Sequence, residues 1–180
     1  MIWGKFITDK VIISTYNRKK LYFAVAVKDK KIIKTILPKS SEKETLNEIS
    51  REFNSYILSD EYRSFAEDIC NIYYGKHVSF GNEAINLDLN EFQKRVLLEV
   101  MKIPYGKVKT YKQISKAIDS KAYRAVGTAI GKNPLPLIIP CHRVVRSDLK
   151  VGGFLGGPEM KKEILKNEGI CIVNDRVNIV

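Results

Sequence analysis

The sequence has few of the residues on which disulfide-rich and membrane proteins depend. It contains three cysteines in 180 residues, at positions 70, 141 and 171, and no CxxC pair. This scarcity favours reduced thiols in a reducing compartment over a disulfide framework. No apolar run approaches the ~20 residues needed to span a bilayer, and the first residues lack the apolar core of a signal peptide. These absences predict a cytoplasmic protein that has no membrane partner.

Acidic residues are also scarce relative to basic ones, and the formal net charge is +11. The excess is uneven, because residues 1–85 hold 14 basic and 11 acidic side chains whereas residues 86–180 hold 17 and 9. A one-sided basic excess indicates a polyanionic partner, usually nucleic acid. The alternative is a solvated lysine-rich surface, which together with only two glutamines would be typical of a thermophile.

Residues 1–85 are predicted to form a small structural α/β subdomain. Three β-rich runs separated by polar turns predict strands at 11–16, 21–27 and 32–37. Ser41 followed by Glu44 is a capping-box pattern, which predicts a helix to about Leu58 with Ile57 on its inward face. A second helix is predicted over residues 60–74 and ends at Gly75. Residues 76–88 are predicted to be an extended connector.

Residues 86–180 are predicted to bind DNA. Asn90 is placed to cap a helix that runs to about Met101. Thr110 is placed to cap a short helix, and a third helix is predicted from Ala122 to about Lys132, so residues 110–132 form a helix-turn-helix pattern. Against one acid, this region carries six basic residues: Lys109, Lys112, Lys116, Lys121, Arg124 and Lys132. Basic charge on two short helices indicates contacts with phosphates.

The third predicted helix is rich in small residues, including Ala125, Gly127 and Gly131. Small residues on an exposed face would let the backbone approach a minor groove closely. Equally, they would suit close helix packing inside the protein. Arg124 projects from the start of this helix.

The cysteine at position 141 stands in the segment Pro140-Cys141-His142-Arg143, inside an apolar run. A thiol becomes a nucleophile as thiolate, and a neighbouring imidazole or guanidinium favours that form. The alternative is a buried structural thiol.

A glycine-rich loop follows at residues 151–157, and it lacks the Lys-Ser/Thr ending of a P-loop. It is suited to close backbone approach to a ligand, with Phe154 as a wall. Pro158 is placed to start a last helix, near whose end Glu168 could return toward His142. Residues 170–180 are predicted to form a terminal hairpin.

Over about residues 92–169 the chain resembles the O6-alkylguanine-DNA alkyltransferase family. The resemblance is carried by several motifs in order: Ile103-Pro104-Tyr105-Gly106, Thr110-Tyr111, Arg124-Ala125-Val126-Gly127, Asn133-Pro134, Pro140 to Val145 and Glu168-Gly169. It implies an α+β fold, in which a small RNase H-like sheet and helix subdomain precedes a mostly helical, winged-helix-like domain that carries the active-site cysteine.

The resemblance implies a single-use reaction without a cofactor. Cys141 would accept an alkyl group irreversibly from O6 of guanine in double-stranded DNA, after minor-groove binding has flipped the base out. Whether O4-alkylthymine is also a substrate stays open. The implied roles are a proton relay through His142, a water and Glu168; protonation of the departing base by Tyr111; positioning of the active-site strand by Asn133; and filling of the vacated stack by Arg124.

The family also implies a substrate pocket and a DNA surface. The pocket residues are Pro136, Val144, Phe154, Leu155 and Gly156. The DNA contacts are Arg124, Lys109, Lys112, Lys121, Ala125, Gly127 and Gly131. Phe154 and Leu155 replace residues with which relatives bond guanine, so this loop would offer stacking and backbone contacts. With Cys70 and His77 as its main candidates, the first subdomain has too few ligands for zinc. The protein is expected to act as a monomer with no obligate protein partner.

Three other readings compete with alkyl transfer. An alkyltransferase-like protein would lack the acceptor cysteine, which is present here. A helix-turn-helix regulator with a redox-sensing Cys141 would carry long polar side chains on its third helix. A cysteine hydrolase would need an oxyanion hole, for which the sequence has no indication.

Overall fold

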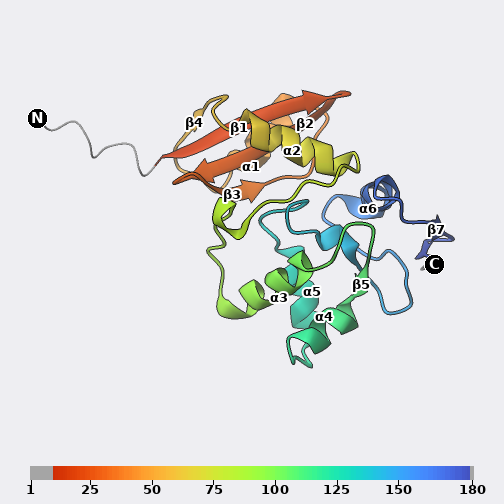
Figure 1. Cartoon of the computed structure of the whole chain (residues 1–180). Helices are drawn as coiled ribbons and strands as arrows, with labels where there is room; N and C mark the ends of the chain where they lie inside the picture. The colour runs from red at the N-terminus through yellow and green to blue at the C-terminus, as the bar shows by residue number, and fades with distance from the viewer. Residues whose placement is uncertain (1–9, 179–180) are drawn as a thin grey trace, which may run out of the picture. The chain divides into compact units, whose positions relative to one another are not determined.

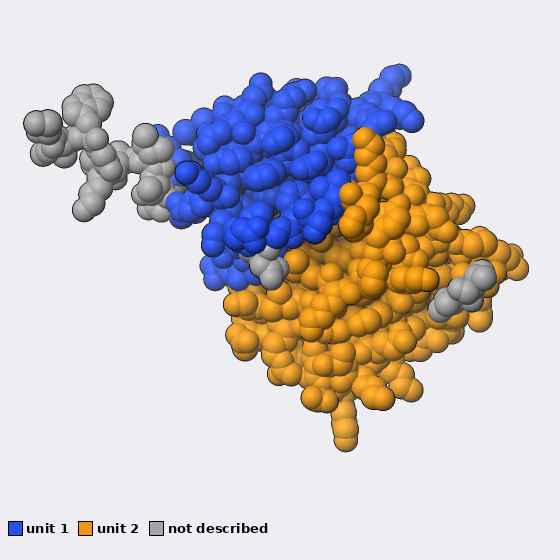
Figure 2. All heavy atoms as spheres, in the orientation of Figure 1, with its two compact units in different colours: residues 1–71, 78–88 blue, residues 72–77, 89–180 orange. Residues whose placement is uncertain are grey.

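The computed structural model describes residues 10–178, which fall into two compact units (Figures 1 and 2). Unit 1 comprises residues up to 71 and 78–88, and unit 2 comprises residues 72–77 and 89 onward. Residues 1–9 and 179–180 lie outside the described part. They include the N-terminal segment that lacks a signal-peptide pattern and the last two residues of the predicted terminal hairpin. Among residues 10–178, no helix has both the length and the apolar content that crossing a bilayer requires.

Unit 1 is built on a four-stranded sheet with strand order β3-β2-β1-β4. Its elements are β1 (Val11–Arg18), β2 (Leu21–Lys28), β3 (Lys31–Thr35), α1 (Glu42–Ser50), β4 (Tyr56–Leu58), most of α2 (Arg63–Tyr73) and a 3₁₀ turn, η1 (Asn82–Ala84). The three predicted strands are confirmed. Two-residue turns join them, and both turns have positive φ at each residue, as the right-handed twist of a hairpin requires.

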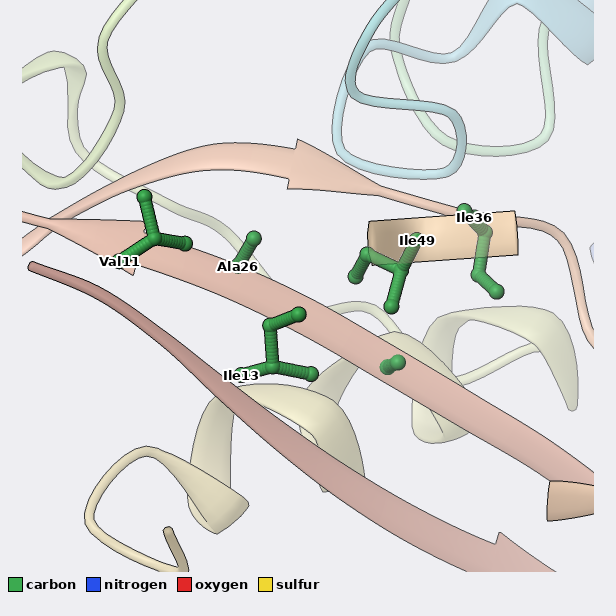
Figure 3. Packing of buried hydrophobic residues seen from close by; sticks show 6 residues of the cluster. Val11, Ile13, Ala26, Ile36 and Ile49 are labelled. Carbon is green, nitrogen blue, oxygen red and sulfur yellow. The ribbon is translucent and has the colours of Figure 1, made fainter. Parts of the chain in front are cut away.

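One apolar layer of unit 1 lies between α1 and one face of the sheet. Figure 3 shows side chains of β1 and β2 meeting Ile49 of α1 and Ile36, which follows β3. Ser41 caps α1 by accepting a hydrogen bond from the Glu44 backbone N–H at 3.3 Å, as the capping pattern predicts. Alternation along the strands and a 3.6-residue period along the helix together produce this apolar layer.

The predicted extension of α1 to Leu58 is wrong. The helix ends at Ser50, and residues 56–58 form β4, which pairs in parallel with β1. Ile57 is therefore 43% exposed on an edge strand instead of facing the core. Asn54 and Ser55 disfavour a helix, because their side chains compete for backbone hydrogen bonds. The open edge of β1 offers hydrogen-bond partners to residues 56–58, and a pattern read along neighbouring residues does not include these distant partners.

Unit 2 is mostly helical. It contains α3 (Glu91–Met101), β5 (Lys109–Thr110), α4 (Tyr111–Ala117), α5 (Tyr123–Gly131), a second 3₁₀ turn, η2 (Cys141–Arg143), β6 (Val144–Val145), α6 (Gly157–Asn167), β7 (Ile172–Val173) and β8 (Arg176–Val177). The predicted caps Asn90 and Thr110 are confirmed, and Thr110 forms a complete capping box with Gln113. β5 pairs in parallel with β6, which places the helix-turn-helix beside the segment that carries Cys141.

Side chains of α3 tie both helices of the helix-turn-helix at their C-terminal ends. Arg95 Nη2 donates to the carbonyl of Ile118 at 2.6 Å, and Gln93 Nε2 donates to the carbonyl of Lys132 at 3.1 Å. These bonds satisfy carbonyls that a helix end leaves without an internal partner. The relative placement of α4 and α5 therefore depends on α3.

Candidate active site

Cys141 lies at a cavity of about 340 Å³ within unit 2. The cavity is lined by Tyr111, Gly127, Ile130, Gly131, Asn133, Pro136, Cys141, Gly153, Phe154 and Leu155. Eight of these ten residues were predicted to belong to the site or to the DNA surface, and they come from α4, α5, the loop after α5, η2 and the glycine-rich loop. The predicted pocket residues Val144 and Gly156 are not among its lining residues.

The segment around Cys141 was expected to be a strand, and this expectation is wrong. Cys141–Arg143 form a 3₁₀ turn. The Arg143 backbone N–H donates to the Pro140 carbonyl at 2.9 Å, which closes the turn, and strand geometry begins at Val144. The ring of Pro140 restricts its φ to −77° and favours the tight turn. The turn directs successive side chains differently from a strand, and Cys141 and His142 are both buried.

Asn133 holds the loop that precedes the cysteine. Its Nδ2 donates to the Ile139 carbonyl at 2.9 Å, and its Oδ1 accepts from the Leu135 backbone N–H at 3.0 Å. Burial raises the pKa of the Cys141 thiol, against a hydrogen bond to Asn133 that lowers it. The resting thiol is therefore protonated, and it needs a base to become a thiolate.

Such a base lies next to the cysteine in the chain. His142 Nε2 lies 2.8 Å from Glu168 Oε1, and both side chains are buried. Burial lowers the pKa of His142, against the opposing effect of Glu168, so the imidazole is neutral. A carboxylate only accepts hydrogen bonds, so Nε2 carries the proton and Nδ1 is left with its lone pair. Nδ1 is buried and has no hydrogen-bond partner among the described residues.

Glu168 is ionised because two residues donate to it. Burial alone would raise its pKa, but hydrogen bonds from His142 and Arg143 outweigh burial and lower the pKa to about 2. Arg143 Nε donates to Glu168 Oε2 at 2.9 Å, and its Nη2 donates to Oε1 at 2.8 Å. This bidentate contact fixes the orientation of the carboxylate and stabilises its negative charge.

Tyr111, the first residue of α4, lines the cavity. Burial raises the pKa of its phenol, and the neighbouring Cys141 raises it further. The hydroxyl therefore keeps its proton and can donate to a group in the cavity.

The outer face of the helix-turn-helix combines positive charge with an open helix surface. Arg124, Ala125, Lys112 and Lys121 are exposed. A Cβ added at Gly127 or Gly131 would meet nothing within 4 Å, so these glycines are not packed against another helix of the protein. This favours the close-approach interpretation of the small residues over internal packing. Lys109 lies in an ion pair with Glu99 at 2.8 Å.

Comparisons with known proteins agree with this geometry. Residues 91–170 match the family model described as 6-O-methylguanine DNA methyltransferase, DNA binding domain. The methylated-DNA–protein-cysteine methyltransferase of Metallosphaera sedula is 39% identical over 118 residues, which cover 66% of this chain and 74% of that protein. The chain belongs to the O6-methylguanine-DNA methyltransferase family.

Other relatives support the same assignment. The methylated-DNA–protein-cysteine methyltransferase of Sulfolobus acidocaldarius is 48% identical over 102 residues, covering 57% of this chain and 64% of that protein's length. A Methanococcus jannaschii O6-methylguanine DNA methyltransferase structure has a TM-score of 0.65 at 33% identity and covers 92% of this chain and 99% of its own. Mycobacterium tuberculosis OGT in complex with DNA has a TM-score of 0.71 at 28% identity, over 88% and 92% of the two chains. The predicted α+β fold is confirmed.

Two residues of this family member's site were not identified from the sequence. Arg143 had no assigned task, yet besides binding Glu168 it donates from Nη1 to the Ile103 carbonyl at 2.8 Å and lies over the Tyr105 ring. Its position in the Cys141 segment was a signal for an ionic role. The partner could not be chosen, because Glu168 lies 25 residues away in the chain.

Lys161 is the second missed residue, and it is fully buried. Its Nζ donates to the carbonyls of Val144 at 2.6 Å, Val151 at 2.7 Å and Gly153 at 3.3 Å. Burial lowers the pKa of Lys161 to about 8, and its charge acts to lower the pKa of Cys141. The available signal was its place three and four residues before Ile164 and Leu165, on the apolar face of α6.

Proposed function

We propose that this protein repairs O6-alkylguanine in double-stranded DNA by transferring the alkyl group to Cys141, once and irreversibly. The observation that carries the proposal is Cys141 at a cavity that Tyr111, Asn133 and the glycine-rich loop also line, directly preceding a buried neutral imidazole in the chain. Family membership supports the same activity, and the names of the relatives describe it.

The proposed chemistry is a displacement at carbon. The Sγ–H proton passes through a water to Nδ1 of His142, and the imidazolium that forms is stabilised by Glu168. The thiolate then attacks the alkyl carbon, so that an S–C bond forms as the O6–C bond breaks and the electron pair remains on guanine. Tyr111 supplies a proton to N3 of the departing base. No cofactor takes part, because the thiol and the alkylated base supply every atom of the transfer.

Substrate entry requires the base to leave the duplex, since Cys141 is buried and a base that stays stacked cannot reach it. We assign minor-groove approach to α5, where Ala125, Gly127 and Gly131 leave room for a DNA backbone. Arg124 is assigned to the space that the flipped nucleotide vacates, and Lys112 and Lys121 to phosphates. Lys109 is assigned to a further phosphate, and to reach it the side chain would have to weaken its ion pair with Glu99.

The pocket roles rest on local geometry. Pro136 and Phe154 would contact the faces of the base, and Leu155 and Gly156 would offer backbone groups to its edge. The backbone N–H of Val144 already donates to the Cys141 carbonyl, and its own carbonyl accepts from Lys161. We therefore propose that Val144 shapes the pocket through Lys161. O4-alkylthymine remains a candidate second substrate.

The location we propose is the cytoplasm, because the reaction consumes a reduced thiol and that compartment keeps thiols reduced. None of Cys70, Cys141 and Cys171 forms a disulfide bond. The division of labour proposed for residues 1–85 and 86–180 is a structural first subdomain and a reactive, DNA-binding second one.

The deciding experiment is incubation with duplex DNA that contains O6-methylguanine, followed by intact-protein and peptide mass measurement. We expect one methyl group per protein, located on Cys141, and none on a Cys141→Ala variant. The matched control is Cys171→Ala, which removes an exposed free thiol and should react as the wild type does. Methylation of Cys70 or Cys171, or repeated turnover by one protein molecule, would sink the proposal.

A further inference from the structure

Tyr123, the first residue of α5, has no task in the reaction described above. Its side chain belongs to a residue that is 52% exposed, which is unusual for a large aromatic. It precedes Gly127 by four residues and Gly131 by eight, so the three residues share one row along the helix. Gly127 and Gly131 line the cavity that also holds Cys141. The ring therefore lies on the helix row that leads to the cavity.

The direction of the ring follows from helix geometry. Side chains on an α-helix lean toward the N-terminus, over the preceding turn. The Tyr123 side chain consequently leans past the N-terminal end of α5 and away from Gly127, and it is not among the residues that line the cavity. The space over Gly127 and Gly131 is open. A base that reaches Cys141 along this row would leave the ring next to the base that stays behind.

The charges around the ring select the kind of partner. Lys121 and Arg124, within two residues of Tyr123, are both exposed. The helix-turn-helix region contains six basic residues and one acidic residue. An exposed aromatic ring among cations is the arrangement that proteins use to stack on nucleic-acid bases while phosphates are held nearby. Apolar and aromatic wedges at the minor groove also unstack base steps.

We propose that Tyr123 stacks on the base adjacent to the flipped nucleotide and acts as a second wedge beside Arg124. This inference rests on the proposed repair of duplex DNA and adds a positioning residue to it. In the extruded state the adjacent base loses one stacking neighbour, and the phenol ring replaces it. Tyr123 would then stabilise the flipped state and have no contact with the reacting atoms.

The test compares Tyr123→Ala and Tyr123→Phe with the wild type by the rate of transfer to Cys141. Two alkyl donors are used, an O6-methylguanine duplex and free O6-benzylguanine. We expect Tyr123→Ala to be about tenfold slower on the duplex, the size of one lost base–aromatic stack, and unchanged on the free base. Tyr123→Phe keeps the ring and should match the wild type. Tyr56→Ala, which removes a 41% exposed tyrosine from β4, is the matched control and should change neither rate.

A second measurement reports the stack directly. 2-Aminopurine is placed next to the lesion, and the Cys141→Ala background prevents reaction. With Tyr123 present the probe stays quenched at saturating protein, whereas Tyr123→Ala leaves it bright. Equal duplex rates for Tyr123→Ala and the wild type would overturn the inference. Equal losses on both donors, or a Tyr123→Phe variant as slow as Tyr123→Ala, would overturn it too. A wild type that accepts no alkyl group at Cys141, neither methyl from the duplex nor benzyl from the free base, refutes the proposed function itself.

Discussion

At the scale of single residues, the site depends on one buried carboxylate that serves two neighbours. Glu168 accepts from His142 and from Arg143, which are consecutive in the chain and 26 and 25 residues away from it. Hydrogen bonds from both side chains keep the carboxylate ionised, and the ionised carboxylate fixes which imidazole nitrogen carries the proton. The neutral His142 imidazole, whose pKa is lowered by burial, therefore presents the Nδ1 lone pair that its proposed role as a base requires.

Glu168 should therefore stabilise the fold in a pH-dependent manner. Its folded pKa of about 2 lies below the ordinary value of 4.5. The stabilisation is thus complete above pH 4.5 and is lost as the pH falls toward 2. We expect the gap in unfolding free energy between the wild type and Glu168→Gln to shrink by about 3 kcal/mol over this window. Urea unfolding followed by circular dichroism at several pH values measures it.

The control is Glu67→Gln, which alters an exposed glutamate of α2. Its gap from the wild type should be small and nearly constant with pH. A Glu168→Gln gap that stays constant down to pH 2 would contradict the assigned ionisation.

At the scale of elements, α5 combines a buried face with an open one. Val126 and Ile130 are buried at i, i+4 spacing, while Gly127 and Gly131 line the cavity. Glycine lowers helix stability because it gives up more backbone freedom on folding than other residues do. The two glycines therefore lower the stability of this nine-residue helix, but they keep side chains out of the cavity beside Cys141.

Gly127→Leu should separate these two effects. The free protein has room for a side chain at this position, so we expect the unfolding free energy to rise by about 0.5 kcal/mol. The same side chain occupies the cavity, and transfer should slow at least about tenfold with duplex and with free O6-benzylguanine. Chemical denaturation and single-turnover rates report the two quantities.

Thr128→Leu is the matched control, because it places the same side chain on the exposed neighbouring position. This variant should react with the free base as the wild type does. A fully active Gly127→Leu protein would show that bases do not enter along this row.

At the scale of the whole molecule, the charge of +11 predicts attraction to DNA but does not say which lysines act. The structure separates them by their partners. Lys112 is exposed, while Lys109 already neutralises the nearly buried Glu99. A lysine that must leave a carboxylate gains less from a phosphate than a free lysine does.

The salt dependence of DNA binding should reveal this difference. Lys112→Ala should reduce the slope of log affinity against log salt by about 0.9, the value for one lost phosphate contact. Lys109→Ala should reduce it by less. Fluorescence-anisotropy titrations of a labelled duplex across a series of salt concentrations measure both slopes. Identical losses would show that Glu99 releases Lys109 on binding.

Local patterns were sufficient for most elements of this chain. Three kinds of local feature each depend on neighbours within a few positions, and the structure agrees with them over the residues that it describes: the strands within residues 11–37, the caps at Asn90 and Thr110, and the terminal hairpin. The segment around Cys141 indicated a candidate reactive thiol beside a histidine but left a buried structural thiol open, and the resemblance over residues 92–169 favoured the reactive thiol. The cysteine and the histidine are adjacent in the chain, so a local pattern includes both.

Only the tertiary structure decided the features that depend on distant partners. Residues 56–58 became a strand because β1 offered an open edge. Arg143 acquired its partner when α6 returned Glu168 to the cysteine segment. Lys161 was buried because three carbonyls, one from β6 and two from the glycine-rich loop, converge on its amine. A sequence states which groups a residue can bind, but burial and convergence arise from packing, which only the folded chain determines.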